Sequence, residues 1–435
     1  MGSRLTNRAN APSADGPFFE QPQVSHEPAS PNASAGDTCH VEHPRRSGSS
    51  AKNHCGDARA QTPERDAGFA TQEASADDRK IDFERAKELF RKRQNGGRLT
   101  TDEEAFLKRA IAARQRGQGA GSGQGRDARM LPPKETTGFK PLDQMTADER
   151  YFDQDGGLYG GGSNEPTADH RAAAERELAK IVPLNGKGEP DADGHIVLVS
   201  ISMSNATQEF SRFKQIADAD PDKSIRLTIV DCAQGGQAMA EWVKPDAQPW
   251  SEATRRLERA GVTPAQVQVA WIKLANKGPR GDLQTHGRKL QDDTRTVIQN
   301  AKARFPNLRV AYLSSRIYGG YKSSPLNPEP YAYESAFAVR WLIQEQTKGS
   351  AALKYQAPGN TEQSVNALLL LWGPYLWGDG ITPRKSDGLV WKRDDLAGDG
   401  THPSQSGREK VAHLPLSFFN EDQLACGWFI DSEKR

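Results

Sequence analysis

The sequence predicts an α/β fold in which a parallel β-sheet is covered by helices on both faces. From about residue 170 onward, short apolar runs of strand length alternate with amphipathic helical stretches, and all eight tryptophans lie between Trp242 and Trp428. Apolar runs without polar alternation are typical of strands buried on both faces, and strands joined by helices pair in parallel. We therefore expect about five parallel strands in one domain spanning residues 141–435.

The strands and helices of this domain are expected in alternation. The apolar runs are HIVLVSI (195–201), IRLTIVD (225–231), VQVAWIKLA (267–275), LRVAYLSS (308–315) and ALLLLWGPY (367–375). The clearest helical stretches between them are 251–260, 284–304 and 331–346. Because ligands of such folds bind at the carboxyl ends of the strands, the residues that follow each run are the candidates for a site.

The first 80 residues differ in composition from the rest of the chain. They are rich in Ala, Ser, Pro, Gly, Asn and charged residues, and their only aromatic residues are Phe18, Phe19 and Phe69. Such a segment buries too little apolar surface to offset a backbone entropy of roughly 1–2 kcal/mol per residue. We expect a disordered tail at 1–80.

The cysteines and histidines of the chain give no metal or disulfide framework. Four cysteines are too few and too scattered for a disulfide scaffold. Zinc-type ligands do gather in the tail, at Cys39, His40, His43, His54 and Cys55. Their spacing matches no usual zinc finger and no apolar nucleus surrounds them, so we expect no metal and no cofactor.

A charged helical hairpin is expected at 81–116, followed by a glycine-rich linker at 117–140. Asn95-Gly96-Gly97 separates two stretches with helical apolar spacing, and Thr101 begins an acidic first turn. This hairpin could bind a protein partner or act as a solvated spacer. GQGAGSGQGR (117–126) has neither a preceding strand nor a following helix, so it does not predict a phosphate loop.

Charge and hydropathy exclude several classes of partner. The formal net charge of +1 gives no global attraction to nucleic acid or to a membrane surface, and no apolar run reaches the length of a transmembrane helix. The N-terminus lacks the apolar core of a secretory signal. We expect a cytoplasmic protein, or a secreted one if the true start lies upstream.

Small and polar residues gather at three places, after each of the first two expected strands and before the helix expected near the C-terminus. Ser202 to Thr207 follow the first strand, and Gly235 and Gly236 follow the second. Near the C-terminus, Asp399-Gly400-Thr401-His402-Pro403 precedes a helix, with Pro403 suited to its first position. A histidine that acts as a general base needs its second ring nitrogen bonded to a carboxylate, which Asp399 can supply for His402. Ser204 would then be the nucleophile, with Ser202 as the alternative.

Together these positions resemble the SGNH (GDSL-like) hydrolase superfamily over roughly residues 190–420. The resemblance implies a flavodoxin-like three-layer sandwich. It also implies a nucleophilic serine at Ser204 in SMSN, an oxyanion glycine at Gly236 in AQGG, and an Asp-x-x-His pair at Asp399 and His402. Ser202 and Met203 stand where the family usually has Gly and Asp. The stretches SSRIYGGY, NPEPYAYESAFAVRW, WGPYLWGDG and DGTHPS also resemble uncharacterised SGNH-like proteins of planctomycete type.

One family block is missing. A Gly-x-Asn-Asp motif is expected after VQVAW, where the chain reads IKLANK. Two alternatives remain open: Asn276 supplies the oxyanion amide one place late, or Lys273 stabilises the oxyanion by charge.

The resemblance implies a serine esterase that hydrolyses a small O-acyl ester, for which an acylated carbohydrate is one candidate. Asn205, Gly235, Tyr318 and Trp377 are the candidate substrate contacts, the two aromatic rings by stacking on a sugar. The missing block favours an alternative, namely a non-catalytic SGNH-like binding domain that has lost turnover.

Overall fold

The computed structural model describes residues 134–322, 326–355 and 365–434, together with 99–117 and scattered positions between 82 and 92. By internal contacts the chain divides into two units, Met1–Gly123 and Gln124–Arg435. The expected tail at 1–80, its Cys and His cluster, and the linker glycines beyond residue 117 lie outside the described residues.

The described part of the first unit is helical. Helix α2 spans Thr101–Gly117, and its Leu107 and Ala110 are buried against Ala86 and Leu89. The helix is capped by Thr100, one residue earlier than expected. Thr100 Oγ1 accepts a hydrogen bond from the Glu103 N–H at 3.2 Å, and Glu103 Oε2 accepts one from the Thr100 N–H at 2.8 Å. This reciprocal pair is a capping box.

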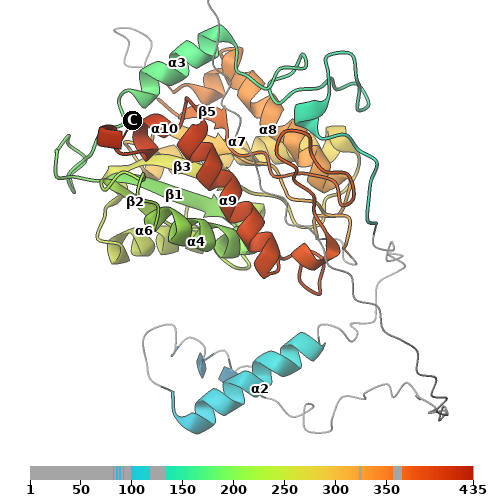
Figure 1. The fold of residues 1–435 in the computed structure, drawn as a ribbon. Coiled ribbons are helices and arrows are strands. Elements are labelled where there is room, and N and C mark those ends of the chain that lie inside the picture. The colour runs from blue at the N-terminus through green and yellow to red at the C-terminus, as the bar shows by residue number, and fades with distance from the viewer. Residues whose placement is uncertain are drawn as a thin grey trace, which may run out of the picture. The chain divides into compact units, whose positions relative to one another are not determined.

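The second unit is built on five parallel strands, which confirms the predicted α/β fold (Figure 1). The strands are β1 (Ile196–Ser202), β2 (Leu227–Val230), β3 (Val267–Lys273), β4 (Val310–Leu313) and β5 (Leu369–Trp372). Their order β2-β1-β3-β4-β5 is the flavodoxin-like order, and every residue of β1 and β3 is buried. The chain leaves β1 toward one edge of the sheet and β3 toward the other, so a crevice is expected at their carboxyl ends.

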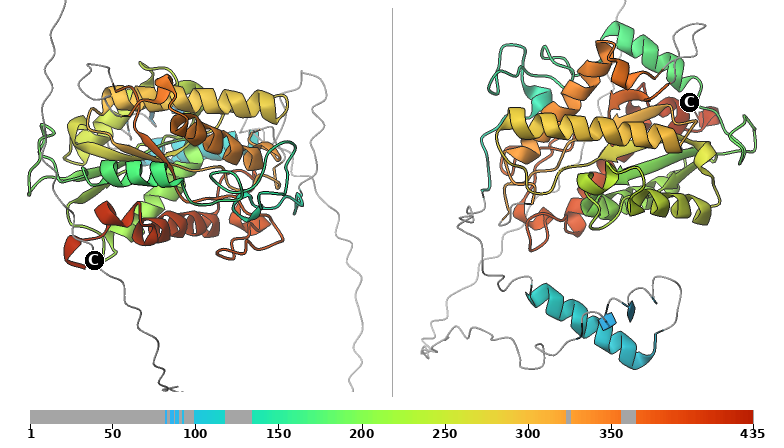
Figure 2. Two further views of the ribbon diagram at one scale, coloured as in Figure 1. Left: turned by 90° about the horizontal axis from the view of Figure 1, so that it is seen from above. Right: turned by 180° about the vertical axis from the view of Figure 1, so that it is seen from behind.

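Helices cover both faces of this sheet (Figure 2). On one face α4 (Ser204–Asp218) packs against α9 (Gln405–Glu421), which contacts α10 (Cys426–Phe429). On the other, α5 (Met239–Trp242) contacts both α6 (Gln248–Arg259) and α7 (Arg288–Arg304), and α7 contacts α8 (Tyr331–Thr347). Helix α3 (Ala168–Leu178) contacts β5. The shorter helical turns are η2 (Leu142–Gln144), η3 (Pro264–Gln266), the π-helical η4 (Leu283–Gly287), η5 (Ala351–Leu353), η6 (Arg393–Asp395) and η7 (Ser432–Lys434).

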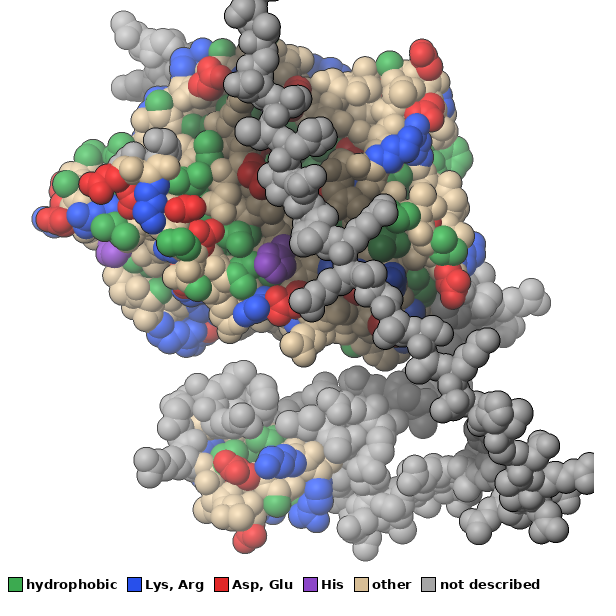
Figure 3. Space-filling model, viewed as in Figure 1, with side chains coloured by type: hydrophobic (Ala, Val, Ile, Leu, Met, Phe, Trp, Pro, Cys, Tyr) green, Lys and Arg blue, Asp and Glu red, His purple; other side chains and the backbone are tan. Residues whose placement is uncertain are grey.

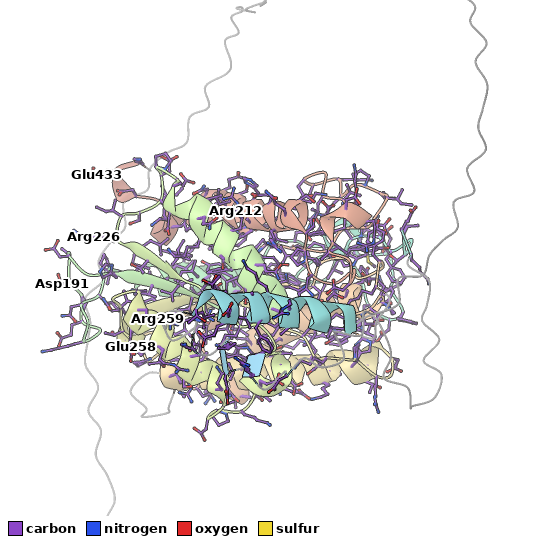
Figure 4. All side chains as sticks on the ribbon, turned by 90° about the horizontal axis from the view of Figure 1, so that it is seen from below. Asp191, Arg212, Arg226, Glu258, Arg259 and Glu433 are labelled. Atoms are coloured by element: carbon purple, nitrogen blue, oxygen red, sulfur yellow. The ribbon has the colours of Figure 1, made fainter. Side chains whose placement is uncertain are left out.

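Aromatic packing fixes α4 and α9 against the sheet. Phe210 of α4 stacks on Trp271 of β3 with ring centroids 5.3 Å apart, and Phe213 contacts Phe419 of α9 at 5.7 Å. Arg212 projects from α4 (Figure 4) and its Nε lies 2.8 Å from Glu409 of α9. The first and last long helices of the domain are therefore joined directly.

The surface of the described residues carries both signs of charge side by side on the face seen in Figure 3. No helix among the residues described is both long and apolar enough to cross a membrane.

Candidate active site

The structure brings Ser204, His402 and Asp399 together. The Ser204 Oγ lies 2.9 Å from His402 Nε2, and His402 Nδ1 lies 2.5 Å from Asp399 Oδ2. A carboxylate can only accept a hydrogen bond, so in the neutral imidazole Nδ1 carries the proton and Nε2 accepts from the serine hydroxyl. This is the hydrogen-bond chain that a serine nucleophile and its base require.

The Asp399 carboxylate is fixed by its own loop. Its Oδ1 accepts hydrogen bonds from the backbone N–H groups of Thr401 at 2.9 Å and His402 at 3.0 Å. Partial burial acts to raise the pKa of this carboxyl, but the bonds from the His402 ring and from the two N–H groups outweigh it and hold the pKa below its ordinary value. Asp399 therefore stays ionised beside the imidazole.

A short bridge holds this loop before α9. Leu396 pairs antiparallel with Pro403, and the Ala397 N–H donates to the His402 carbonyl at 2.7 Å. Helix α9 begins at Gln405 with Ser404 as its N-cap, because the Ser404 hydroxyl accepts from the Gly407 N–H. Pro403 thus lies before the helix, and the prediction that it occupies the first helical position was wrong.

Two further residues set the position of the loop. Gly400 has φ +62°, and a Cβ there would lie 2.3 Å from the Tyr321 carbonyl oxygen, so only glycine fits without movement. Asn205 is buried, and its Nδ2 donates to the Thr401 carbonyl at 2.7 Å. The residue next to Ser204 therefore holds the loop that carries His402. Asn205 had been expected to contact substrate; its side chain is used within the protein.

Ser204 occupies the first turn of α4. Its neighbour Met203 is the extended N-cap, and no side chain in the described structure caps this helix end. The first N–H groups of a helix lack intrahelical acceptors, so they are free to bind a developing negative charge here.

The predicted oxyanion glycine lies in an adjacent turn. Gln234 pairs with Met203, its N–H donates to the Ser202 carbonyl, and its own carbonyl accepts from the Gln237 N–H across Gly235 and Gly236. Gly236 has φ +81° as the third residue of this turn, which suits a type II turn. Both glycines are exposed, and within the described residues the Gly236 N–H donates to no acceptor.

The structure commits Lys273 to a partner in the interior. Its side chain is fully buried and its Nζ donates to Glu209 of α4, whose side chain is also fully buried. Burial lowers the pKa of Lys273, and the Glu209 charge opposes this shift. A cation in this position is structural rather than exposed to a substrate.

Asn276 is likewise engaged. Its Nδ2 donates to Asp293 of α7 at 2.9 Å, and its N–H donates to the Tyr331 hydroxyl at 3.0 Å. Among the described residues, these hydrogen bonds link Asn276 to α7 and α8 and not to the Ser204–His402 pair.

The remaining candidates are core residues. Tyr318 and Trp377 are 1% and 0% exposed, and the Tyr318 hydroxyl donates to the Lys134 carbonyl while Trp377 Nε1 donates to Glu329. Neither ring presents a face to a sugar. Ser202 is also fully buried, with its hydroxyl bonded to the Lys273 carbonyl, so the alternative nucleophile is inaccessible.

Sequence reasoning missed Glu209. A usable signal was present, because Glu209 precedes Phe210 on the buried face of a helix and Lys273 ends a strand that is apolar except for Gln268. Two charges of opposite sign in such positions predict a buried ion pair.

Comparisons with known proteins add little to this geometry. No family model matches the sequence, and the comparison with curated proteins gives no match. Several solved structures, among them the following three, are similar at low level. A protein from Arabidopsis thaliana has 14% identity and TM-score 0.27, covering 49% of this chain and 66% of its own. A putative acylhydrolase from Bacteroides fragilis has 12% identity and TM-score 0.29, covering 57% and 95%. A salicylyl-acyltransferase from a tetracycline biosynthetic pathway has 12% identity and TM-score 0.29, covering 54% and 58%. These values carry no argument about activity.

Proposed function

We propose that the protein is a serine esterase of SGNH-like design that hydrolyses a small O-acyl ester. The observation that carries the proposal is the continuous hydrogen-bond chain from Ser204 through His402 to Asp399, with distances of 2.9 and 2.5 Å. Ser204 and His402 are both partly exposed, so a substrate can reach the serine oxygen.

The reaction follows from the proton positions. Ser204 Oγ attacks the ester carbonyl carbon while its proton passes to His402 Nε2, and the carbonyl oxygen becomes an oxyanion. The imidazolium, stabilised by Asp399, then returns the proton to the departing alkoxide, which leaves as the alcohol. A water molecule, deprotonated by His402, attacks the acyl-serine, and collapse of this second intermediate frees the carboxylic acid and the Ser204 hydroxyl.

Backbone N–H groups supply the oxyanion hole in this proposal. The donors are the Ser204 N–H at the uncapped start of α4 and the Gly236 N–H in the neighbouring exposed turn. Preorganised donors of this kind stabilise charge that develops in the transition state without reorganisation. Every protein group in this mechanism is a side chain or a backbone N–H of this chain.

The alternative function is a binding domain without turnover. It is favoured by one observation, the absence of a Gly-x-Asn-Asp block after β3 and the structural use of Lys273 and Asn276 in its place. This alternative predicts a Ser204 hydroxyl that never becomes acylated.

A labelling experiment separates the two. The full chain is incubated with an alkyl fluorophosphonate, and hydrolysis of p-nitrophenyl acetate is followed in parallel. We expect covalent modification of Ser204 and ester turnover, both lost in Ser204→Ala and both kept in the control Ser251→Ala on the exposed surface of α6. Turnover and labelling that persist in Ser204→Ala would contradict the proposed nucleophile.

A further inference from the structure

Two buried cations without partners lie at the carboxyl edge of the sheet. Arg316 is 2% exposed and Lys322 is 6% exposed. The Nε and Nη1 of Arg316 and the Nζ of Lys322 make no hydrogen bond with any residue that the structure describes. Buried charges are normally paired, because desolvation disfavours them otherwise. A bound anion would supply the negative charge that both groups lack.

Arg316 lies near the nucleophile helix α4, on the side of Glu209. It follows the end of β4 at Leu313 by three residues, and β4 pairs with β3. Its guanidinium interacts electrostatically with Glu209 of α4 and with Lys273 of β3. Glu209 is in direct contact with Lys273, so one carboxylate faces two cations and positive charge is in excess.

Lys322 lies against the base loop. The position of a Cβ on Gly400 is 3.2 Å from Lys322 Cα, and Gly400 stands between Asp399 and Thr401. Lys322 interacts electrostatically with Arg316, Asp399 and Glu329. The two cations therefore share one region, bounded by the loop that carries His402 and by the helix that carries Ser204.

The acids around Lys322 are already engaged. Asp399 accepts from His402, and Glu329 accepts from the N–H groups of Gly319 and Tyr333 and from Trp377 Nε1. Burial, and to a smaller extent the Arg316 charge, lower the pKa of Lys322 to about 7 against the opposing effect of Asp399 and Glu329. A bound anion would favour the charged form of this lysine.

We propose that Arg316 and Lys322 form an anion-binding subsite beside the nucleophile, and that the ester substrate carries an acidic group near its scissile bond. A guanidinium binds a carboxylate or a phosphate through two parallel N–H donors, and an ammonium adds a third donor. The inference rests on the proposed esterase function, of which it specifies the substrate class.

Paired esters test the subsite. On the acyl side, p-nitrophenyl acetate is compared with the mono-p-nitrophenyl ester of succinic acid; on the alcohol side, phenyl acetate is compared with 3-acetoxybenzoate. We expect wild type to hydrolyse the anionic member of one pair with the higher kcat/KM. In Arg316→Met and Lys322→Met the anionic-to-neutral ratio should fall by about 10–100-fold, the scale of one hydrogen bond to a charged group.

Matched controls lie near the opposite, amino end of β4, one directly before the strand and one on α7. Arg309 directly precedes β4 and pairs with Glu177, and Lys302 donates to the carbonyls of Pro306 and Leu308. Arg309→Met and Lys302→Met should leave the ratio unchanged. Arg316→Lys and Lys322→Arg keep the positive charge and serve if one of the methionine variants does not fold. Each should lower the anionic-to-neutral ratio less than the methionine variant that does fold.

Anion binding is also measured without turnover. The rise in melting temperature caused by succinate and by inorganic phosphate is recorded in Ser204→Ala, with and without Arg316→Met. Stabilisation that requires Arg316 supports the subsite even if no ester is hydrolysed, in which case the proposed function alone fails. Ser204-dependent hydrolysis with no preference for either anionic ester, and no stabilisation by either anion, would overturn the subsite and leave the esterase standing.

Discussion

Two segments at the carboxyl edge of the sheet use similar residue types in opposite ways. The loop 399–402 is partly exposed, and its carboxylate and imidazole lead to the Ser204 hydroxyl. The segment 273–276 after β3 also offers a charge and an amide, but Lys273 is sealed in an ion pair and Asn276 is tied to α7. The difference teaches that the role of a polar group depends on its hydrogen-bond partner. Neither the residue type nor the distance from a strand end tells whether the group is available to a substrate or holds the fold together.

The sharpest test of the exposed segment is non-additivity. Ser204→Ala and His402→Ala should each lower ester turnover by about 10³–10⁶-fold, and the double variant should lose no more than the single ones, because nucleophile and base act as one unit. Initial rates with p-nitrophenyl acetate measure this. Losses that multiply in the double variant would show that the two residues act independently.

Substitutions in the buried ion pair of Lys273 and Glu209 are expected to lower the stability of the fold more than the activity. Glu209→Ala leaves the Lys273 charge buried without its partner, and should lower the free energy of unfolding by about 3–5 kcal/mol in urea titrations. The matched control is Glu409→Ala, which breaks the partly exposed pair with Arg212 and should cost about 0.2–1 kcal/mol. Equal costs for the two variants would mean that the buried pair has no special role.

Gly400→Ala addresses how finely the loop must be placed. The added Cβ would meet the Tyr321 carbonyl oxygen at 2.3 Å, so the loop must shift and carry His402 with it. A displacement of about 1 Å can cost about 10² in turnover. Gly398→Ala, two residues earlier in open space, should keep the wild-type rate. Full turnover in Gly400→Ala would show that the close contact between Gly400 and the Tyr321 carbonyl does not determine the position of His402.

The smallest effect is expected at Asn276. Because its amide donates to Asp293, Asn276→Ala should lower turnover by less than about tenfold, whereas loss of an oxyanion donor costs about 10²–10³. Steady-state kcat decides between the two. A drop on the larger scale would place this amide in the oxyanion hole and erase the contrast between the segments.

The sequence predicted the parts that depend on local pattern. Four of the five strands lie within the expected apolar runs and β1 extends one residue beyond its run, to Ser202, because strands buried on both faces are mostly apolar. Asp399 and His402 were found from a spacing of three residues, which a tight loop converts into contact. The pairing of Lys273 with Glu209 could not be found in this way, since it joins residues 64 positions apart.

Tyr318 and Trp377 also show that contacts between distant segments could not be predicted from the sequence. Their places near strand ends predicted exposed rings, yet both are buried, and Tyr318 donates to the Lys134 carbonyl far earlier in the chain. Strand-end reasoning says where a site can be, but it does not say which other segments cover that edge.

The contact between α4 and α9 joins the two parts of the proposed site late in the sequence. Ser204 and His402 are 198 residues apart, on either side of the strands β2 to β5, and Asn205 bonds to the His402 loop from the same helical turn as the nucleophile. Closing so long a loop costs entropy, and contacts between residues far apart in sequence slow folding. In the proposed esterase, Ser204 therefore has no base until synthesis has passed residue 402.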